Sequence, residues 1–282
     1  MIVRDYNEMK PFLPAMEMKG EPTIFQDALR TAQERLTEFI LGSDLEALLE
    51  QRDENQSDLL RRCQRIISVD AFLSSIPEMD LVLTDAGFAV INTQDMAPAS
   101  KERIQRLFDT MQRKLDDNLD GLVRYLVRTS QYNPWRGTEQ FTRLSDGLIM
   151  TLAEFRDAAV LNPITEPAWP KRWKEFLDLN SALNVALTTT VASYISTEYA
   201  DEILEKMRDL ESFFPKERVV LKLIKTAIAA IAMGDNETGV RQAIKAAQYM
   251  KANPDDFPTF MASAAAHDLT LTYTDTPIFS LL

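Results

Sequence analysis

The chain has 282 residues, a formal net charge of −12, 45% hydrophobic residues and 26% charged residues. These proportions are those of a globular protein, so wholesale disorder is excluded, and the length suffices for one large domain or two modest ones. A broad acidic surface repels nucleic-acid backbones, so we expect no specific nucleic-acid partner. Only 8 residues are glycine, whereas Ala, Leu and Met are common, which predicts a mainly α fold built as a helical bundle.

The scarcity of cysteine and histidine limits the chemistry that this chain can perform. With Cys63 alone, no intramolecular disulfide can form, and with His267 alone, no site with several histidines can hold a metal. The sequence also has neither a P-loop nor a GxGxxG motif. We therefore expect a protein that is not an enzyme, with no catalytic, cofactor-binding or metal-binding residues and no small-molecule substrate.

The N-terminal residues 1–22 contain Pro11, Pro14, Gly20 and Pro22, which predicts an irregular arm. They have no basic stretch followed by a long apolar run, so we expect no secretory signal. The most apolar stretch, residues 219–234, contains two lysines. That stretch is therefore predicted to be a buried helix and not a membrane span, so no membrane partner is expected.

Residues 23–128 are predicted to form a first helical lobe that also contains a β-hairpin. Its first helix should end at Gly42, and a short successor should follow through Glu50. A third helix should begin at Ser57 or Asp58 and end near Ile76, before Pro77. Cys63 lies inside the apolar stripe of that helix, so we interpret it as a core thiol and not as a nucleophile.

The helical rhythm is interrupted at residues 81–91. The runs LVLT and FAVI flank Asp85, Ala86 and Gly87, which predicts a hairpin with a three-residue turn ending in glycine. An isolated hairpin is marginally stable in water, so it should pack on helices or contact a partner. Asp85, Ala86, Gly87 and Phe88 are accordingly candidate partner-contact residues.

The strongest helical pattern covers residues 101–128, with Ser100 as its predicted cap. Its apolar residues from Ile104 to Val127 form one stripe, and its length suits the central helix of a bundle. The basic residues at 101–114 are interpreted as the solvated face of that helix. The adjacent carboxylates Asp116 and Asp117 are likewise expected at the surface.

The irregular stretch 129–170 contains proline, glycine and tryptophan residues and is predicted to connect two lobes. Trp135, Trp169 and Trp173 cluster in it or beside it. Aromatic residues of this kind either fill the junction of two lobes or line a groove or interface. Trp135 is therefore also a candidate partner-contact residue.

The second helical lobe is predicted over residues 171–267. Its first helix should run to about Ser196, with Asn180 and Asn184 interrupting the apolar stripe. Two later helices should form a hairpin at Gly234, Asp235 and Asn236.

The C-terminal tail, residues 268–282, begins with alternating apolar and polar residues, which predicts a half-buried strand. Its apolar end should dock on its own domain or on a neighbouring subunit. The candidate partner-contact residues of the tail are Pro277, Ile278, Phe279, Leu281 and Leu282.

The stretch 81–107, LVLTDAGFAVINTQDMAPASKERIQRL, resembles a motif of uncharacterised structural proteins from tailed bacteriophages and prophages. In that motif, two strands around a Gly-Phe turn are followed by an Ala-Pro-Ala-Ser-Lys-Glu-Arg segment that leads into a long helix. The matching residues are Leu83, Thr84, Gly87, Phe88, Val90, Ala97, Pro98, Ala99, Ser100, Lys101, Glu102 and Arg103.

The resemblance implies a virion structural or assembly protein, such as a head–tail connector or adaptor that forms a ring through protein–protein contacts. The implied partners are further copies of the chain and neighbouring virion proteins such as the portal. The implied location is the host cytoplasm during assembly and then the virion. A ring of this kind requires a heterologous interface that closes by rotation.

Two alternatives remain open on the residues alone. The first is a small-molecule binding module with an aromatic-lined groove around residues 129–173. The second is an enzyme that uses carboxylates only, because 43 residues are acidic and such sites leave no local signature. The first predicts a deep pocket, and the second predicts several converging carboxyl groups with raised pKa values.

Overall fold

The computed structural model describes residues 1–14, 24–79, 81–84, 87–90, 100–145, 147–159, 169–209 and 212–267. Its fold is mainly α, as the composition predicts. The chain divides into two compact units. Unit 1 contains Met1–Thr142 and Glu166–Arg172, and unit 2 contains Arg143–Thr165 and Trp173–Leu282. The first division falls inside the stretch 129–170, and the chain returns to unit 1 for a few residues before unit 2 is completed.

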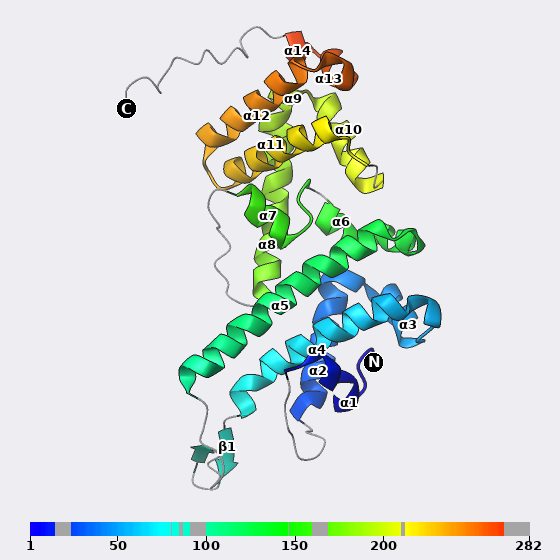
Figure 1. Ribbon diagram of the computed structural model, residues 1–282, viewed down its shortest axis with the longest axis vertical. Helices are drawn as coiled ribbons and strands as arrows, with labels where there is room; N and C mark the ends of the chain where they lie inside the picture. The colour runs from blue at the N-terminus through cyan, green and yellow to red at the C-terminus, as the bar shows by residue number, and fades with distance from the viewer. Residues whose placement is uncertain are drawn as a thin grey trace. The chain divides into compact units, whose positions relative to one another are not determined.

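Unit 1 is built on two long helices, α4 and α5, which lie side by side in Figure 1. A third helix, α2, also packs against α4. The elements of the unit are α1 (Tyr6–Met9), η1 (Lys10–Phe12), α2 (Ile24–Leu36), η2 (Thr37–Leu41), α3 (Ser43–Glu50), η3 (Glu54–Gln56), α4 (Ser57–Met79), β1 (Leu81–Thr84), β2 (Gly87–Val90), α5 (Lys101–Arg128), η4 (Ser130–Gly137) and α6 (Glu139–Ser145), whose last residues belong to unit 2.

The core of unit 1 follows the apolar stripes of the sequence. On α5, the stripe is buried from Met111 through Leu115, Leu119 and Leu122 to Leu126. Spacings of three and four residues place these side chains on one face of the helix, which packs against α4. Gly42 has a φ of 74°, a left-handed conformation that suits glycine, and it separates η2 from α3.

The predicted end of the third helix was wrong by one turn. Helix α4 includes Pro77 and continues to Met79. Proline removes one backbone donor and crowds the preceding turn. Near the end of a helix only one turn is affected, so the proline does not stop the helix where the sequence rule places the boundary.

The first 14 residues do not form the irregular arm that the prolines predict. Helix α1 begins after Asp5, whose carboxylate accepts a hydrogen bond from the backbone N–H of Glu8. Ile2, Val3 and Met9 are completely buried. These apolar side chains fix the segment in the core of unit 1, because their burial outweighs the irregularity that proline introduces. Residues 15–22 of the predicted arm lie outside the described residues.

The two strands lie where the sequence predicts a hairpin. Strands β1 and β2 pair antiparallel, with Leu81 opposite Val90 and Thr84 opposite Gly87. Gly87 therefore belongs to a strand and not to the turn. Asp85 and Ala86 lie outside the described residues, as does the strand expected at residues 268–282.

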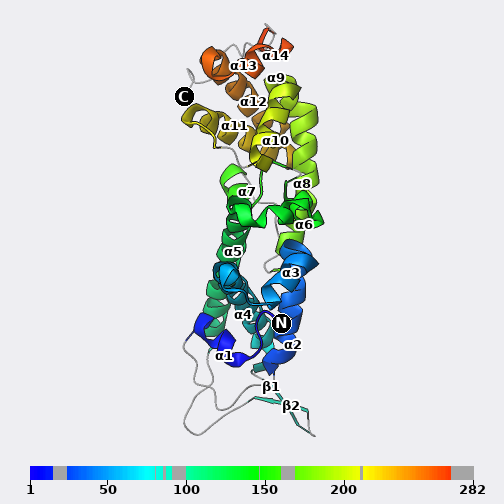
Figure 2. The same ribbon diagram turned by 90° about the vertical axis from the view of Figure 1, so that its right-hand side faces the viewer.

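Unit 2 is helical in its described residues and is drawn from green to red in Figure 2. Its elements are α7 (Leu152–Ala158), α8 (Lys171–Val185, whose first two residues belong to unit 1), η5 (Ala186–Val191), α9 (Ala192–Ile195), α10 (Thr197–Asp209), α11 (Pro215–Ala232), α12 (Asn236–Lys251), η6 (Pro254–Asp256), α13 (Pro258–Met261) and α14 (Ala264–His267).

The helix predicted from Pro170 to Ser196 is three consecutive segments, because η5 is a π-helical stretch between α8 and α9. It ends at Ser196, whose φ is 73°. Asn180, which interrupts the apolar stripe, is almost completely buried. Its amide nitrogen donates to the carbonyl oxygens of Arg143 and Leu144 at 3.0 and 3.2 Å. The polar residue thus joins α8 to the end of α6 within unit 2.

Helices α11 and α12 form the helical hairpin that Gly234, Asp235 and Asn236 predict. Gly234 adopts a φ of 85°, and the Asp235 carboxylate accepts a hydrogen bond from Thr238 N–H at 3.0 Å. The two helices approach closely at Gly239. A Cβ atom built there would lie 2.3 Å from Cγ1 of Ile231.

Candidate functional site

The candidate contact residues of the hairpin and tail are only partly described. Gly87 and Phe88 lie in β2, and Asp85, Ala86, Pro277, Ile278, Phe279, Leu281 and Leu282 lie outside the described residues. The structure therefore places two of these residues on a strand and leaves the others as predictions.

Trp135 is positioned for the core and not for a partner. Its side chain is only 3% exposed, and its indole N–H donates to the carbonyl oxygen of Ile40 at 2.6 Å. The ring also makes an edge contact with Phe141 at a centroid distance of 5.2 Å. A tryptophan with its N–H satisfied and its ring buried stabilises unit 1, so contact with a partner would require part of that unit to open.

Cys63 is buried in α4, as the apolar stripe predicts. Burial raises the pKa of its thiol above the ordinary range. A thiol that is neutral and inaccessible neither attacks a substrate nor binds a metal ion.

The interpretation of Asp116 as a solvated residue was wrong. Asp117 is exposed, but Asp116 is buried, and it accepts a hydrogen bond from the Gln112 amide at 3.3 Å. One step along a helix rotates the side chain by about 100°, so neighbours face different surroundings. The guanidinium of Arg172 forms an ion pair with the Asp116 carboxylate. That partner lies 56 residues away in the sequence, so no local pattern predicts it.

A second buried carboxylate, Asp70, holds the same returning segment. It accepts a hydrogen bond from the indole N–H of Trp169 at 3.0 Å and forms an ion pair with Arg35 at 3.3 Å. Burial raises the pKa of Asp70, although Arg35 and Trp169 oppose the shift. A carboxylate-only enzyme would need a carboxyl group with a raised pKa. The Asp70 carboxylate, however, is engaged in the packing of α4 against α2 and residues 169–172.

The surface of α5 changes character along the helix. Its apolar stripe continues N-terminal of the buried part through Ile104, Leu107 and Phe108, yet all of these residues are only half-buried. Across residues 101–110, every described side chain is at least partly exposed. The five basic residues of this region, Lys101, Arg103, Arg106, Arg113 and Lys114, are exposed, as the amphipathic pattern predicts.

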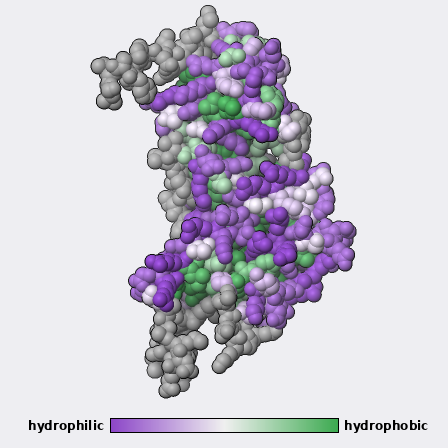
Figure 3. Space-filling model, viewed as in Figure 1, coloured by the Kyte–Doolittle hydropathy of each residue, from purple (hydrophilic) through white to green (hydrophobic). Residues whose placement is uncertain are grey.

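This half-buried apolar stripe, defined as Ile104, Leu107 and Phe108, is the candidate functional site of unit 1. Each of these side chains retains apolar surface that contact with another molecule would remove from water. In the view of Figure 3, hydrophobic patches interrupt a mainly hydrophilic surface. The stripe is distinguished by its position, because Ile104 and Leu107 lie within the stretch 81–107 that carries the resemblance and Phe108 directly follows it.

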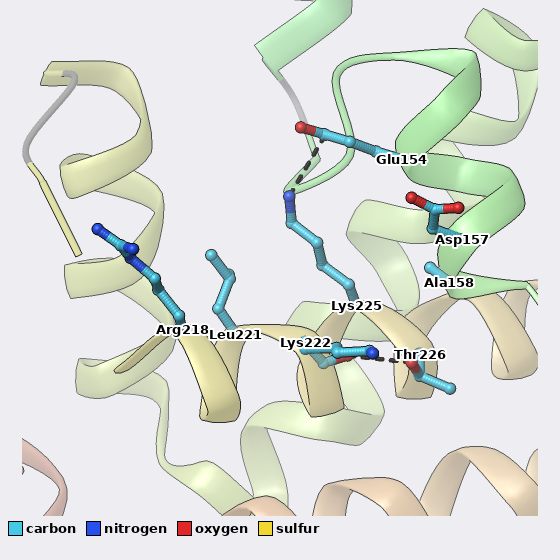
Figure 4. A pocket seen from close by; sticks show the side chains of 8 residues that line it. All are labelled: Glu154, Asp157, Ala158, Arg218, Leu221, Lys222, Lys225 and Thr226. Carbon is cyan, nitrogen blue, oxygen red and sulfur yellow. Dashed lines mark hydrogen bonds and ion pairs between the residues drawn. The ribbon is translucent and has the colours of Figure 1, made fainter. Parts of the chain in front are cut away.

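A cavity with a volume of about 570 Å³ lies in unit 2 between α7 and α11. Figure 4 shows the side chains that line this α7–α11 pocket, namely Glu154, Asp157, Ala158, Arg218, Leu221, Lys222, Lys225 and Thr226. Glu154 and Lys225 point toward one another and form an ion pair at 3.3 Å. The Glu154 carboxylate also accepts a hydrogen bond from Met150 N–H at 3.1 Å, so this residue supports the start of α7.

The remaining charged groups of the α7–α11 pocket are two cations, Arg218 and Lys222, and one carboxylate, Asp157. All three are exposed. The Arg218 guanidinium donates to the carbonyl oxygen of Phe213 at 2.9 Å. Lys222 is therefore the cation of this pocket that is most available to a ligand. The pocket is therefore suited to a small anionic group. Its Glu154–Lys225 ion pair already has a structural role at the start of α7.

One described cavity lies beside part of the stretch 129–173, where an aromatic groove is expected. A cavity of about 110 Å³ lies beside Tyr132, Pro134 and Trp135 and is closed on its other side by α3. Ligand pockets have volumes of roughly 300 to 1,000 Å³. This cavity holds at most a few atoms, so it does not provide the deep pocket that the binding-module alternative predicts.

Within the described ranges, no group of three or more His, Cys, Asp or Glu side chains is arranged to hold a metal ion. His267, the single histidine, ends α14 and is exposed. None of the described helices is both long and apolar enough to cross a membrane.

Comparison with known proteins places a similarity in unit 1. Residues 25–144 match a family of unknown function, DUF6712. The DUF6712 match extends from the start of α2 to the end of α6, so it ends within two residues of the division between the units. It covers less than half of the chain, and it includes α4, both strands and α5. No curated protein and no solved structure matches the chain.

Proposed function

We propose that this chain is a non-enzymatic structural or assembly protein of a tailed-phage virion. In this proposal it acts as a head–tail connector or adaptor and forms a ring through protein–protein contacts. Its partners are other copies of the chain and neighbouring virion proteins such as the portal. The resemblance over residues 81–107 supplies the virion context, and the DUF6712 similarity is compatible with it without assigning a role.

The observation that carries the proposal is the half-buried apolar stripe of α5. The helix is 28 residues long, but its buried positions begin only at Met111. Ile104, Leu107 and Phe108 continue the same stripe with apolar surface exposed. Complete burial of one such side chain stabilises a complex by about 1.5 to 3 kcal/mol. Completing the burial of three half-buried side chains in an interface therefore contributes a few kcal/mol to association.

Sedimentation velocity of the full chain tests this role of the stripe. The variant Leu107→Ser with Phe108→Ser should weaken self-association or portal binding at least tenfold, because about 1.4 kcal/mol corresponds to a tenfold change in affinity. Val185→Ser is the matched control, since Val185 is 55% exposed and lies in unit 2. Equal association of wild type and both variants would remove the stripe from the interface.

A second candidate function rests on the α7–α11 pocket, which has the volume of a ligand site and two exposed cations. A small carboxylate such as citrate is the appropriate probe. If the pocket binds such ligands, citrate should raise the melting temperature of wild type, and Lys222→Ala should reduce the rise. An unchanged melting temperature in both proteins would exclude small-carboxylate binding there.

A further inference from the structure

A second surface of unit 1 carries unusual charge for this acidic chain. A groove of about 370 Å³ runs between α4 and α5, and we call it the α4–α5 groove. It is lined by Pro11, Phe12, Arg61, Arg65, Val69, Lys114, Asp117 and Asn118. Three of its charged groups are cations and one is a carboxylate, although the chain as a whole has a net charge of −12.

The three cations of the α4–α5 groove are exposed. Among the described residues, Arg61, Arg65 and Lys114 form no ion pair. The guanidinium of Arg65 lies 5.9 Å from the ring centroid of Phe12, which places it beside the apolar wall of the groove. Like charges gathered in a concave surface produce a positive potential that attracts an anionic partner.

Unit 2 carries a complementary surface on α10. Glu198, Asp201 and Glu205 are exposed, and their spacing places them along one side of the helix, so we call them the acidic stripe. Their neighbour Glu202 is paired with Lys206 at 2.8 Å. In contrast, none of the three stripe residues forms an ion pair within the described ranges.

Helix stability explains only one member of the acidic stripe. Glu198 lies in the first turn of α10, where a carboxylate interacts favourably with the helix dipole. Asp201 and Glu205 lie beyond that turn, and the dipole effect falls off within it. Their exposed charges therefore remain available for a partner.

The charged residues of the two surfaces also have the same spacing along their helices. Arg61 and Arg65 are four residues apart on α4, and Asp201 and Glu205 are four residues apart on α10. Each step of four residues advances about 6 Å along a helix, so two helices lying side by side align both pairs of opposite charges at once. Lys114 on α5 adds a third cation from the other wall of the groove.

We infer that the α4–α5 groove of one copy binds the acidic stripe of α10 on a second copy. The inference rests on the proposed ring assembly and names its electrostatic contact. The two surfaces lie on different units of the same chain, so the contact is heterologous. A contact of this type leaves a free groove and a free stripe at the two ends of a dimer, and it propagates until a ring closes.

Charge reversal tests the inference on the full chain. One variant combines Arg61→Glu, Arg65→Glu and Lys114→Glu, and a second combines Glu198→Lys, Asp201→Lys and Glu205→Lys. Each variant alone places like charges in contact and should weaken self-association at least tenfold in sedimentation velocity. The variant with all six substitutions restores opposite charges and should return association to within a few-fold of wild type.

A matched control separates the contact from net charge. Arg143→Glu, Lys174→Glu and Lys245→Glu change the charge as much as the groove variant does, at exposed positions of unit 2. This control should associate as wild type does, and circular dichroism should show equal helix content for all variants. Raising the salt from 0.05 to 0.5 M should weaken wild-type association, because exposed charges are screened.

Several results overturn the inference without affecting the proposed ring. Association that is unchanged by both single reversals, or lost in both and not restored by the six-fold variant, excludes this contact. Equal loss in the control means that net charge is responsible. A wild-type chain that is monomeric in every condition, both alone and with portal protein, overturns the proposed function together with the inference.

Discussion

The indole N–H of Trp169 donates a hydrogen bond to the buried carboxylate of Asp70, 99 residues earlier in the chain. Arg172, three residues after Trp169, forms an ion pair with Asp116. These two contacts attach one short returning segment to α4 and to α5. They explain why residues 166–172 belong to unit 1, although the segments on both sides of them belong to unit 2.

The first prediction concerns the pH dependence of stability at Asp70. Burial raises its pKa, so the folded chain binds this proton more tightly than the unfolded chain does. The stability from this group is complete below about pH 3.9, the unfolded pKa, and is lost as pH rises through the folded pKa. Asp70→Asn should therefore gain stability relative to wild type as the pH rises above about 4, as measured by urea unfolding.

The control for this experiment is Asp117→Asn, which removes an exposed carboxylate from α5. Its stability relative to wild type should change little over the same pH range. If Asp70→Asn also kept a constant difference from wild type, burial would not be the dominant influence on the Asp70 carboxyl group.

The second prediction concerns Glu8, which anchors the N-terminal segment. Its carboxylate accepts hydrogen bonds from both terminal nitrogens of Arg52, at 2.7 and 2.8 Å. These bonds lower the pKa of Glu8, so the stability they provide is present above about pH 4.3 and is lost as pH falls through the folded pKa. Glu8→Gln should cost about 1 kcal/mol of unfolding free energy at pH 7.

The difference between wild type and Glu8→Gln should shrink as the pH falls below about 4.3 in the same urea-unfolding assay. Glu34→Gln, at an exposed position of α2, provides the comparison and should have a small effect throughout. A cost for Glu8→Gln that persists unchanged at pH 3 would contradict the assigned role of the ion pair.

The third prediction uses the chemistry of Cys63. Because the thiol is buried and its pKa is raised, a disulfide reagent such as DTNB at pH 8 should label the native chain slowly. Labelling in urea should be complete within seconds to minutes. Rapid labelling of the native chain would mean that α4 opens readily or that Cys63 is accessible.

The fourth prediction compares two glycines inside helices. A methyl group at Gly239 would meet Ile231 at 2.3 Å and the carbonyl oxygen of Ala227 at 3.0 Å. Overpacking of this kind costs about 1 to 3 kcal/mol, so Gly239→Ala should lower the melting temperature. A methyl group at Gly121 in α5 would meet no described atom within 4 Å, apart from the neighbouring backbone of its own helix. Gly121→Ala should raise stability by up to about 1 kcal/mol, because alanine favours the helix.

A thermal melt of both glycine variants beside wild type checks this pair of predictions. Since the substitution is the same and only the surroundings differ, opposite signs are expected. Stabilisation by Gly239→Ala would show that α11 and α12 are packed less closely than the structure indicates.

The helix bounds and chain reversals that depend on neighbouring residues could be predicted from the sequence. The bounds of α5 follow from its apolar stripe, from Ser100 before it and from the loss of the pattern after Arg128. Gly42 and Gly234 mark chain reversals because their backbones adopt positive φ. These predictions succeed because helix pattern and glycine conformation depend on residues that are close in sequence.

The features of the fold that depend on contacts between distant residues could not be predicted from the sequence. Asp116 was assigned to the surface, yet its partner Arg172 comes from the returning segment. The N-terminal residues were predicted to be irregular, yet Arg52 holds them through Glu8 and the carbonyl oxygen of Ile2. The α4–α5 groove gave no local signal either, because Arg61 and Lys114 are brought to one surface only by the packing of α4 against α5.

We propose that this chain works by assembling with copies of itself and with virion partners. Native mass spectrometry of the full chain over a range of concentrations, alone and with portal protein, tests it most directly. The expected result is a closed oligomer of defined stoichiometry, or a stable complex with the portal. A single monomeric mass at every concentration in both samples would contradict it.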